Sequence, residues 1–506
     1  MYIGRYNMKK KLISSILVAA MVAGTVVGCG GSGDSTQKGG KGSDDYDFYI
    51  FNTKGENADA MQACVDAYEE ETGLTVKLFS LGSGTDSSEM LRTELASKNA
   101  PTIFCCMNPV ALVEFTEGGY AMDLADAENA NFKKLVEEIP ENLKLSDANG
   151  SYGIPFNIEG YGYIVDKEML AAIYGADNVD AWIEAYKTAT YDEFEAMVEA
   201  TTAYIKDGTT ASVTLSGQSF EMVAKDGLAN GLEGVFSMAG SQAWTYGDHL
   251  INVFIDAAFK DAAAVSEATA DQLDAAEKIF EAYAQVIDLK SSNAVIPRGA
   301  DAIGDTTGGY DASVQNFSDG KALFLKQGNW AYTNIKDLHT AGTGNDNIAD
   351  TITFLPIKTP LKDSDIQSGL TADYMNQSIS VFVPNYYVLN KKCDKDQLDK
   401  AEEFLYWLNT SETGQKFVIE DMAFVPYNAD PATTSAGYSL GDSLIEYVAA
   451  GNTITNAYAG CPQQWTGDVV GKYILENYLN KEEWDANAYE DIAKYVISSW
   501  KEKKGL

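Results

Sequence analysis

Residues 317–330 read FSDGKALFLKQGNW, and this stretch is the most informative part of the sequence. Gly320 is expected to end a helix, because glycine adopts the left-handed conformation common at helix C-termini without a steric penalty. The apolar run that follows predicts a short buried strand. Gly328 would then let the chain turn, so that Trp330 projects from the carboxyl end of that strand. A tryptophan in this position is typical of a core residue or of a ligand-binding residue.

The sequence upstream alternates between predicted strands and helices. DFYIF, LTVKLFS and TIFCCM predict three strands, and ADAMQACVDAYEEETG and SSEMLRTELASK predict the helices between them. This order indicates parallel strands joined by right-handed crossovers. Open sheets of this kind bind ligands at the carboxyl ends of their strands. Here those ends are residues 52–54, 82–85 and 107–108.

The remainder of the chain also reads as α/β. YGIPFNIEGYGYIVDKEML, residues 152–170, predicts extended chain that passes into a strand and a helix. Thr190 and Glu193 form a capping box, which opens a mainly helical region expected to reach about Leu289. GADAIGDTTGGY predicts a loop, and three further helices are expected after residue 394.

Composition limits the possible functions. The 506 residues include 74 acidic and 37 basic ones, a formal net charge of -37, which argues against nucleic acid as a partner. Only two histidines occur, His249 and His339, so sites that need several histidines are disfavoured. No common hydrolase or Walker motif and no complete EF-hand loop is present. We therefore expect no catalytic residue, no metal site and no cofactor, although calcium binding by oxygen ligands at a surface loop is compatible with the sequence.

The N-terminus predicts an export signal. Residues 1–28 hold four basic and no acidic residues and end in the mostly apolar run LISSILVAAMVAGTVVG. This run is shorter than the about 20 residues of a transmembrane helix, so it favours a secretory signal peptide. Val26-Val27-Gly28-Cys29 resembles the lipobox of bacterial lipoproteins, which implies cleavage before Cys29 and a diacylglycerol on its sulfur. Residues 29–46 would be the lipidated cysteine and a flexible Gly/Ser-rich tether, holding the protein at the extracellular face of the cell membrane.

The stretch ending at Trp330 resembles the F-x-x-G-K-A-A-M-x-x-x-G-x-W signature of the extracellular solute-binding proteins of ABC importers, the family of maltose-binding protein. Residues 152–170 resemble the family's first crossover between lobes, and residues 352–360 with 378–390 resemble the return crossing. Residues 401–428 are similar to the paired helices after that return. Thr102 and CCMNP, residues 105–109, depart from the family pattern at the lobe-one ligand contacts.

The resemblance implies an α/β, two-lobed periplasmic-binding-protein-like fold of type II. Each lobe would be a mainly parallel sheet flanked by helices, with a ligand cleft at the hinge. The implied lobes are residues 47–155 with 377–425, and residues 156–376 with 426–506. The implied function is capture of a carbohydrate, an oligosaccharide, by hinge closure, and its delivery by a monomer to the transmembrane subunits of an ABC permease.

The resemblance also implies ligand-binding residues. Trp330 would stack on a sugar ring, and Glu159 in the crossover would accept hydrogen bonds from hydroxyls. Trp465 resembles a late aromatic that stacks on sugar in maltose-binding protein. The further candidates are Asn52 and Lys54 at the end of the first strand, and four weaker ones, Tyr161, Tyr163, Tyr310 and Tyr374.

Several alternatives stay open at this point. The same fold could bind a non-sugar solute such as an amino acid or a polyamine. An extracellular carbohydrate-active enzyme could use a pair of the many carboxylates, and a surface lipoprotein could only adhere to a partner. The five cysteines after Cys29 are expected to be buried as free thiols, although a disulfide between two of them is compatible with the sequence. The sequence does not identify the sugar.

Cys29→Ala should leave a folded protein that no longer partitions with membranes. The processed chain has a net charge of about -41, so an anionic membrane surface would not retain it without the lipid. Membrane fractionation of cells that express either chain tests this prediction. A Cys29→Ala chain that remains with the membranes as fully as the wild type would contradict the lipobox interpretation.

Overall fold

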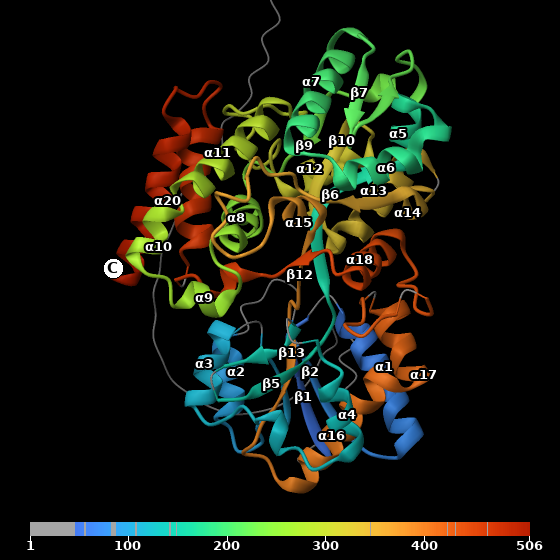
Figure 1. The fold of residues 1–506 in the computed structure, drawn as a ribbon. Helices are drawn as coiled ribbons and strands as arrows, with labels where there is room; N and C mark the ends of the chain where they lie inside the picture. Colours follow the sequence, from blue (N-terminus) through green and yellow to red (C-terminus); the bar gives the residue numbers. More distant parts are fainter. Residues whose placement is uncertain are drawn as a thin grey trace, which may run out of the picture. The chain divides into compact units, whose positions relative to one another are not determined.

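The computed structural model describes residues 46–506, except residues 55–56, 82–87, 107–108, 141–142, 148, 345, 423, 431 and 463. The predicted signal peptide, Cys29 and the tether to residue 45 lie outside the described residues, as do the predicted strand ends at 82–85 and 107–108. None of the helices in the described part is both apolar and long enough to cross a membrane. Figure 1 shows two β-sheets, each accompanied by helices.

The first sheet has the strand order β2-β1-β3-β13-β5-β4. Its parallel part is β1, β2 and β3, and β13 and β5 follow in antiparallel pairing. Helix α1 buries Met61, Cys64, Val65 and Tyr68 on one face, as its spacing predicts, and ends at Gly73 with φ 74°. The strands are β1 (Phe48–Asn52), β2 (Val76–Ser80), β3 (Ile103–Cys106), β4 (Leu145–Ser146), β5 (Ser151–Pro155) and β13 (Tyr386–Leu389). The accompanying helices are α1 (Ala58–Thr72), α2 (Ser88–Leu95), α3 (Pro109–Glu117), α4 (Ala130–Glu137), α16 (Lys395–Thr410) and α17 (Glu412–Lys416).

The second sheet has the order β14-β12-β6-β10-β9, and β11 also pairs with β6. Strand β6 is the longest of the two sheets and is antiparallel to β10, β11 and β12. The strands are β6 (Glu159–Asp166), β9 (Gly234–Ser237), β10 (Ala322–Gly328), β11 (Ile352–Leu355), β12 (Ile379–Phe382) and β14 (Thr453–Ile454). The helices around it include α5 (Lys167–Tyr174), α6 (Val179–Thr188), α7 (Tyr191–Asp207), α8 (Ile251–Ala258), α11 (Glu277–Ser292), α12 (Tyr310–Ser318), α13 (Tyr332–Thr343), α15 (Ala372–Gln377), α18 (Ser439–Ala450) and α20 (Ala488–Lys504).

Both sheets are mixed rather than mainly parallel, which corrects one detail of the predicted fold. The strands that enter and leave each lobe cause the difference. The return strand β13 runs against β3, and the entering strand β6 runs against three neighbours. The α/β, two-lobed architecture itself is confirmed.

The predicted helical region between residues 190 and 289 contains three strands. The capping box at Thr190 is present and opens α7. A hairpin of β7 (Ser212–Leu215) and β8 (Gln218–Glu221) follows, and β9 then joins the second sheet. Ser216 and Gly217 form its two-residue turn with φ of 49° and 73°, the conformation that fits the twist of a tight hairpin. The Ser-Gly pair between alternating apolar residues was the unrecognised signal.

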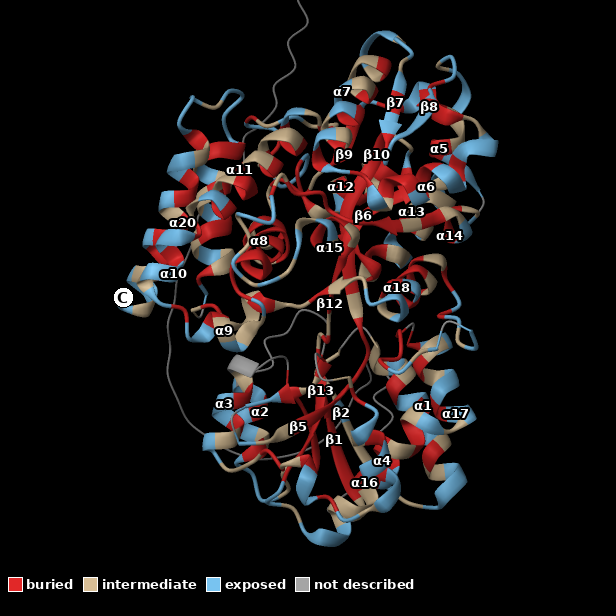
Figure 2. Ribbon diagram, in the orientation of Figure 1, coloured by how far each residue is buried: buried red, intermediate tan, exposed pale blue. Residues whose placement is uncertain are grey.

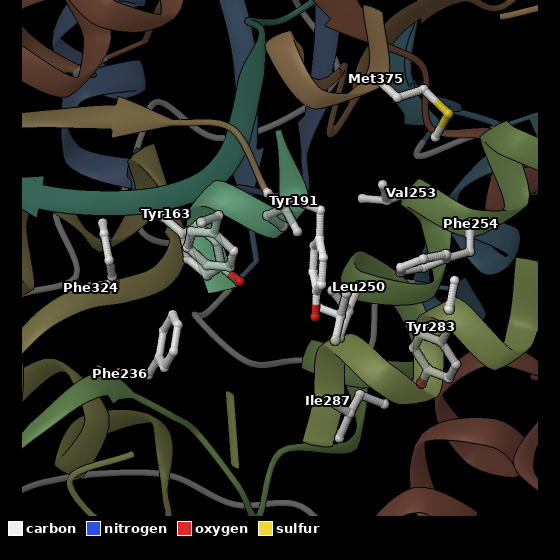
Figure 3. Close-up of a cluster of buried hydrophobic side chains, with 14 of the residues drawn as sticks. Tyr163, Tyr191, Phe236, Leu250, Val253, Phe254, Tyr283, Ile287, Phe324 and Met375 are labelled. Carbon is white, nitrogen blue, oxygen red and sulfur yellow. The ribbon is translucent and has the colours of Figure 1, made fainter. Parts of the chain in front are cut away.

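The hydrophobic interior lies mainly on the two faces of the sheets, as the buried residues in Figure 2 show. One cluster joins the face of β6 and β10 that carries Tyr163 and Phe324 to helices α8 and α11. Figure 3 shows part of it, including Phe236, Leu250 and Tyr283. The opposite face of the second sheet and the core of the first sheet belong to another cluster.

Three chain crossings connect the sheets. The first leads from β5 to β6 through Phe156 and Ile158, and the second leads from β12 to β13. The third returns near Val425, whose carbonyl accepts a hydrogen bond from the Ile158 amide at 2.8 Å. Phe156 stacks on Tyr387 with ring centroids 3.5 Å apart, so the crossings also pack against each other. Because β12 pairs with β6, the return crossing lies after Phe382 rather than at residue 377, where the sequence analysis placed the lobe boundary.

The cysteines are free thiols in the described part of the chain. Cys64, Cys105, Cys106 and Cys461 are buried, and Cys393 is half-buried. This matches the expectation that they act as small apolar side chains.

Candidate functional site

The carboxyl end of β1 presents Lys54 through a local turn. The side-chain oxygen of Asn52 accepts a hydrogen bond from the Lys54 amide at 3.0 Å. The Asn52 amide group donates to the Ser80 hydroxyl at 3.1 Å and to the Lys54 carbonyl at 3.2 Å. Asn52 is fully buried. Its side chain is therefore engaged in shaping the turn, which corrects its prediction as a ligand contact and makes it a support for Lys54.

Lys54 and Glu159 form an ion pair between the two sheets. Their Nζ and Oε1 atoms lie 3.4 Å apart, and the two side chains are 17% and 14% exposed. Asn157 donates to the same carboxylate oxygen at 3.5 Å. The side-chain oxygen of Asn157 is buried and has no hydrogen-bond partner among the described residues. The structure thus brings two predicted residues together and adds Asn157, which sequence reasoning missed although it lies two residues before Glu159.

The register of β6 places further side chains on the same face as Glu159. Phe382 of β12 lies directly opposite Glu159, and Gly328 of β10 lies opposite Tyr161. Since alternate residues of a strand share a face, the side chains of Glu159, Tyr161 and Phe382 point to one side of the sheet, and Gly328 leaves an open position on that side.

Gly328 has a different role from the predicted one. Its φ of -108° and ψ of -179° describe an extended backbone, so no turn requires glycine there. A Cβ atom at this position would instead collide with the six-membered ring of Trp330. The missing side chain therefore lets the Trp330 ring lie against the strand. The indole nitrogen of Trp330 donates to the Gln327 side chain at 3.2 Å and fixes the ring's orientation.

Trp330 belongs to a cluster of six rings, which we call the aromatic cluster. The centroid of His249 lies 4.3 Å from that of Tyr161 and 5.1 Å from that of Trp330. Trp244 continues the series at 5.0 Å from His249 and 6.4 Å from Tyr310. Trp330, Trp244, Tyr310 and Phe382 are all partly exposed. The members are Tyr161, Trp244, His249, Tyr310, Trp330 and Phe382.

Sequence reasoning found only half of this cluster. Trp330, Tyr161 and Tyr310 were predicted, whereas Trp244, His249 and Phe382 were not. Phe382 could have been found only from the register of β12 against β6, and the other two come from a segment that carries no family motif.

Two π-helices hold Trp244 and His249 in place. They are η6 (Thr245–Leu250) and η10 (Thr466–Gly471), and π-helical turns occur frequently at functional sites. A Cβ atom on Gly247 of η6 would collide with the Thr466 carbonyl, and one on Gly471 would collide with the Ala243 carbonyl. The two backbones therefore lie in direct contact. Lys326 donates to the Thr245 carbonyl at 3.1 Å and links η6 to the sheet.

Burial lowers the pKa values of the basic groups next to the aromatic cluster. Desolvation lowers the pKa of Lys326 well below its usual range, and nearby Lys290 lowers it further. Desolvation also lowers the pKa of Lys290 to about 7. The pKa of His249 lies well below its usual value, because the ring is desolvated and Lys326 is near. The His249 imidazole is therefore neutral at neutral pH, and the Lys326 amine lies over the Tyr161 ring, 5.2 Å from its centroid.

Three predicted residues lie away from the aromatic cluster. Trp465 has no exposed surface, donates to the Ser499 hydroxyl at 2.9 Å and packs on Trp500 at 4.6 Å. Its ring is therefore part of the core, which corrects its prediction as a stacking residue. Tyr163 is likewise fully buried in the core. The Tyr374 hydroxyl donates to the Thr453 carbonyl at 2.6 Å and lies 3.0 Å from the Gly451 carbonyl, so it anchors β14.

Within the residues that the structure describes, no three His, Cys, Asp or Glu side chains are grouped to hold a metal ion. The site is thus defined by aromatic rings, neutral amides and one ion pair.

Comparison with known proteins places the chain in a family. Residues 63–439 match the bacterial extracellular solute-binding protein family, and the chain belongs to that family. The predicted relationship is therefore confirmed. No curated protein matches the chain by sequence.

Solved structures show the same fold. RafE from Streptococcus pneumoniae in its apo form is 16% identical, with a TM-score of 0.57 over 90% of this chain and 97% of RafE. RafE in complex with raffinose is 14% identical, with a TM-score of 0.58 over 90% and 99% of the two chains. The GacH receptor of Streptomyces glaucescens, studied unliganded and with acarbose, is 13% identical, with a TM-score of 0.56 over 90% and 97%. At this identity the likeness concerns the fold.

Gly328→Ala should destabilise the protein by about 1–3 kcal/mol, because the added methyl group overpacks the contact with Trp330. Near-UV circular dichroism should change as the ring is displaced. Gly342→Ala is the matched control, since the nearest atom to its Cβ would be 4.0 Å away. Urea unfolding of both variants measures the free energies, and equal stability of Gly328→Ala and wild type would contradict the proposed contact.

Proposed function

We propose that this protein captures a carbohydrate, an oligosaccharide, outside the cell and delivers it to the transmembrane subunits of an ABC importer. The observation that carries this proposal is the aromatic cluster beside the Lys54–Glu159 pair. The C–H face of a sugar ring stacks on an aromatic face, while its hydroxyls need hydrogen-bonding partners at the ring edge. Trp330 supplies the first of these and Glu159, Lys54 and Asn157 supply the second.

The charges at the site favour a sugar over an amino acid or a polyamine. Lys54 and Glu159 form a compensated ion pair at the site. A charged solute would need an opposite charge that is not already compensated, because an unpaired buried charge is costly. Structural neighbours point the same way, since RafE is known with raffinose and GacH with acarbose.

Closure of the two sheets on the sugar is the proposed mechanism of capture. The three crossings supply a hinge, and groups from both sheets meet at the Lys54–Glu159 pair. A sugar that contacts Trp330 on one side and Lys54 on the other stabilises the closed arrangement by its extra contacts there. The protein would act as a monomer without a cofactor, held at the membrane by a lipid on Cys29.

A thermal-shift screen with raffinose, maltotriose, xylotriose and chitotriose tests the ligand class, because a ligand that binds only the folded state raises its stability. The best sugar should bind saturably in titration calorimetry, make the protein more compact in small-angle scattering and be recovered unchanged. Product formation in proportion to protein concentration would instead support an extracellular enzyme. Stabilisation by amino acids or polyamines alone would support a non-sugar solute.

Trp330→Ala should weaken binding of that sugar by at least about tenfold. The variant loses aromatic stacking, worth about 0.5–1.5 kcal/mol beyond area burial, together with the buried area. Trp330→Phe should recover part of the loss. Titration calorimetry measures the affinities.

Trp465→Ala is the matched control for this change. Because Trp465 is fully buried, its removal should cost about 3–5 kcal/mol of stability and leave the affinity of the folded protein unchanged. Unchanged affinity in Trp330→Ala, or a loss in Trp465→Ala equal to that in Trp330→Ala, would overturn the assignment of the stacking residue.

Glu159→Gln should lower the affinity by about five- to tenfold while the fold remains intact. The change keeps the shape but replaces a charged acceptor by a neutral one, and charge-assisted hydrogen bonds are about twice as strong as neutral ones. Glu233→Gln is the control, because Glu233 faces Lys321 at the surface with 57% of its side chain exposed. Equal affinities for the two variants would contradict a role of Glu159 in binding.

A further inference from the structure

His249 lies at the centre of the aromatic cluster. Its ring is stacked on Tyr161 at an interplanar angle of 14°, and Trp244 meets it edge-on at 75°. Trp330 lies next to it on a third side, with centroids 5.1 Å apart. His249 thus occupies the position between the two tryptophans, and it is 9% exposed.

The hydrogen bonding of His249 to the described residues is incomplete. Its Nδ1 atom is buried and has no partner among the residues that the structure describes. A buried polar atom left without a partner is destabilising, so such atoms are few in folded proteins and call for an explanation. The other histidine shows the usual situation: the nitrogens of His339 lie 3.2 Å from the Ser318 carbonyl and 2.8 Å from the Asn347 side-chain oxygen.

The surroundings of His249 keep its imidazole neutral. Desolvation and the neighbouring Lys326 both lower the pKa of His249. A neutral imidazole carries one donor and one acceptor nitrogen. Because Nδ1 of His249 has no partner among the described residues, no protein group fixes whether Nδ1 donates or accepts. A sugar hydroxyl, which also donates and accepts, can pair with either tautomer.

Two further buried polar atoms beside Trp330 and Glu159 lack partners in the described structure. They are the side-chain nitrogen of Gln327, a donor, and the side-chain oxygen of Asn157, an acceptor. Gln327 already accepts a hydrogen bond from Trp330, and Asn157 already donates to Glu159. The site therefore offers an unused donor, an unused acceptor and a ring that can be either. Uncharged hydroxyls satisfy this mixture, whereas a carboxylate or an ammonium group satisfies only one half of it.

We propose that His249 is a specificity-determining residue of the ligand site, whose neutral imidazole hydrogen-bonds a hydroxyl of an uncharged sugar stacked on Trp330. This inference rests on the proposed function. His249 would select for a hydroxyl at the edge of the sugar ring whose face stacks on Trp330.

His249→Phe separates this role from simple packing, because phenylalanine keeps the ring and removes both nitrogens. The variant should bind the best sugar of the four-sugar panel about five- to tenfold more weakly, with a melting temperature equal to or above that of the wild type. His339→Phe should show the reverse, with a lower melting temperature and unchanged affinity, since it removes the ring nitrogens that lie within hydrogen-bonding distance of the Ser318 carbonyl and the Asn347 side-chain oxygen. Wild-type affinity in a folded His249→Phe variant would overturn the proposal.

Nuclear magnetic resonance of the imidazole nitrogens gives an independent readout, because the chain has only two histidines. In ¹⁵N-histidine-labelled protein, titration with that sugar should shift the His249 nitrogens toward a single hydrogen-bonded tautomer and leave those of His339 in place. Binding without a change at His249 would overturn this inference and leave the proposed function standing. If none of the four sugars stabilises the protein, the carbohydrate proposal fails, and this inference fails with it.

Discussion

The register of β6 against its neighbours is the constraint on which the site depends. Pairing with β12 sets Phe382 opposite Glu159, and pairing with β10 sets Gly328 opposite Tyr161. A shift by one residue would turn all of these side chains to the other face of the sheet. The same strand carries Tyr163 and Val165 into the core, so the packing of the interior and the geometry of the site are fixed by one set of backbone hydrogen bonds.

The parts of the fold that the sequence predicted are those with strong local signals. The apolar spacing in α1, the capping box at Thr190 and the glycine that follows α12 all act within a few residues. What it missed depends on contacts between distant segments. The sheets are mixed because the strands that follow the crossings, β6 and β13, pair in antiparallel fashion with their neighbours. The role of Gly328 depends on the position of the Trp330 ring. Trp465 was assigned to the ligand by analogy, but its surroundings come from α20, more than twenty residues further along the chain.

The site joins two kinds of recognition that need different surroundings. Stacking requires rings that are not fully buried, and Trp330 and Trp244 are both partly exposed. Hydrogen bonding requires polar groups held in fixed directions, which Asn52 provides for Lys54 and Asn157 for Glu159. Lys326 links η6 to the rings. Its buried amine donates to the Thr245 carbonyl of η6 and lies over the Tyr161 ring, 5.2 Å from the centroid. The hydrogen bond to the Thr245 carbonyl offsets part of the cost of desolvating that amine.

The direct backbone contact between η6 and η10 has a consequence for how this protein can diverge. Gly247 and Gly471 leave no room for a side chain on either helix, so a substitution in one segment requires an accommodating change in the other. Residues 243–250 and 466–471 therefore need to be exchanged together in the laboratory. A designer who wishes to transfer this wall of the site to a relative must move both pieces, although more than two hundred residues separate them in the chain.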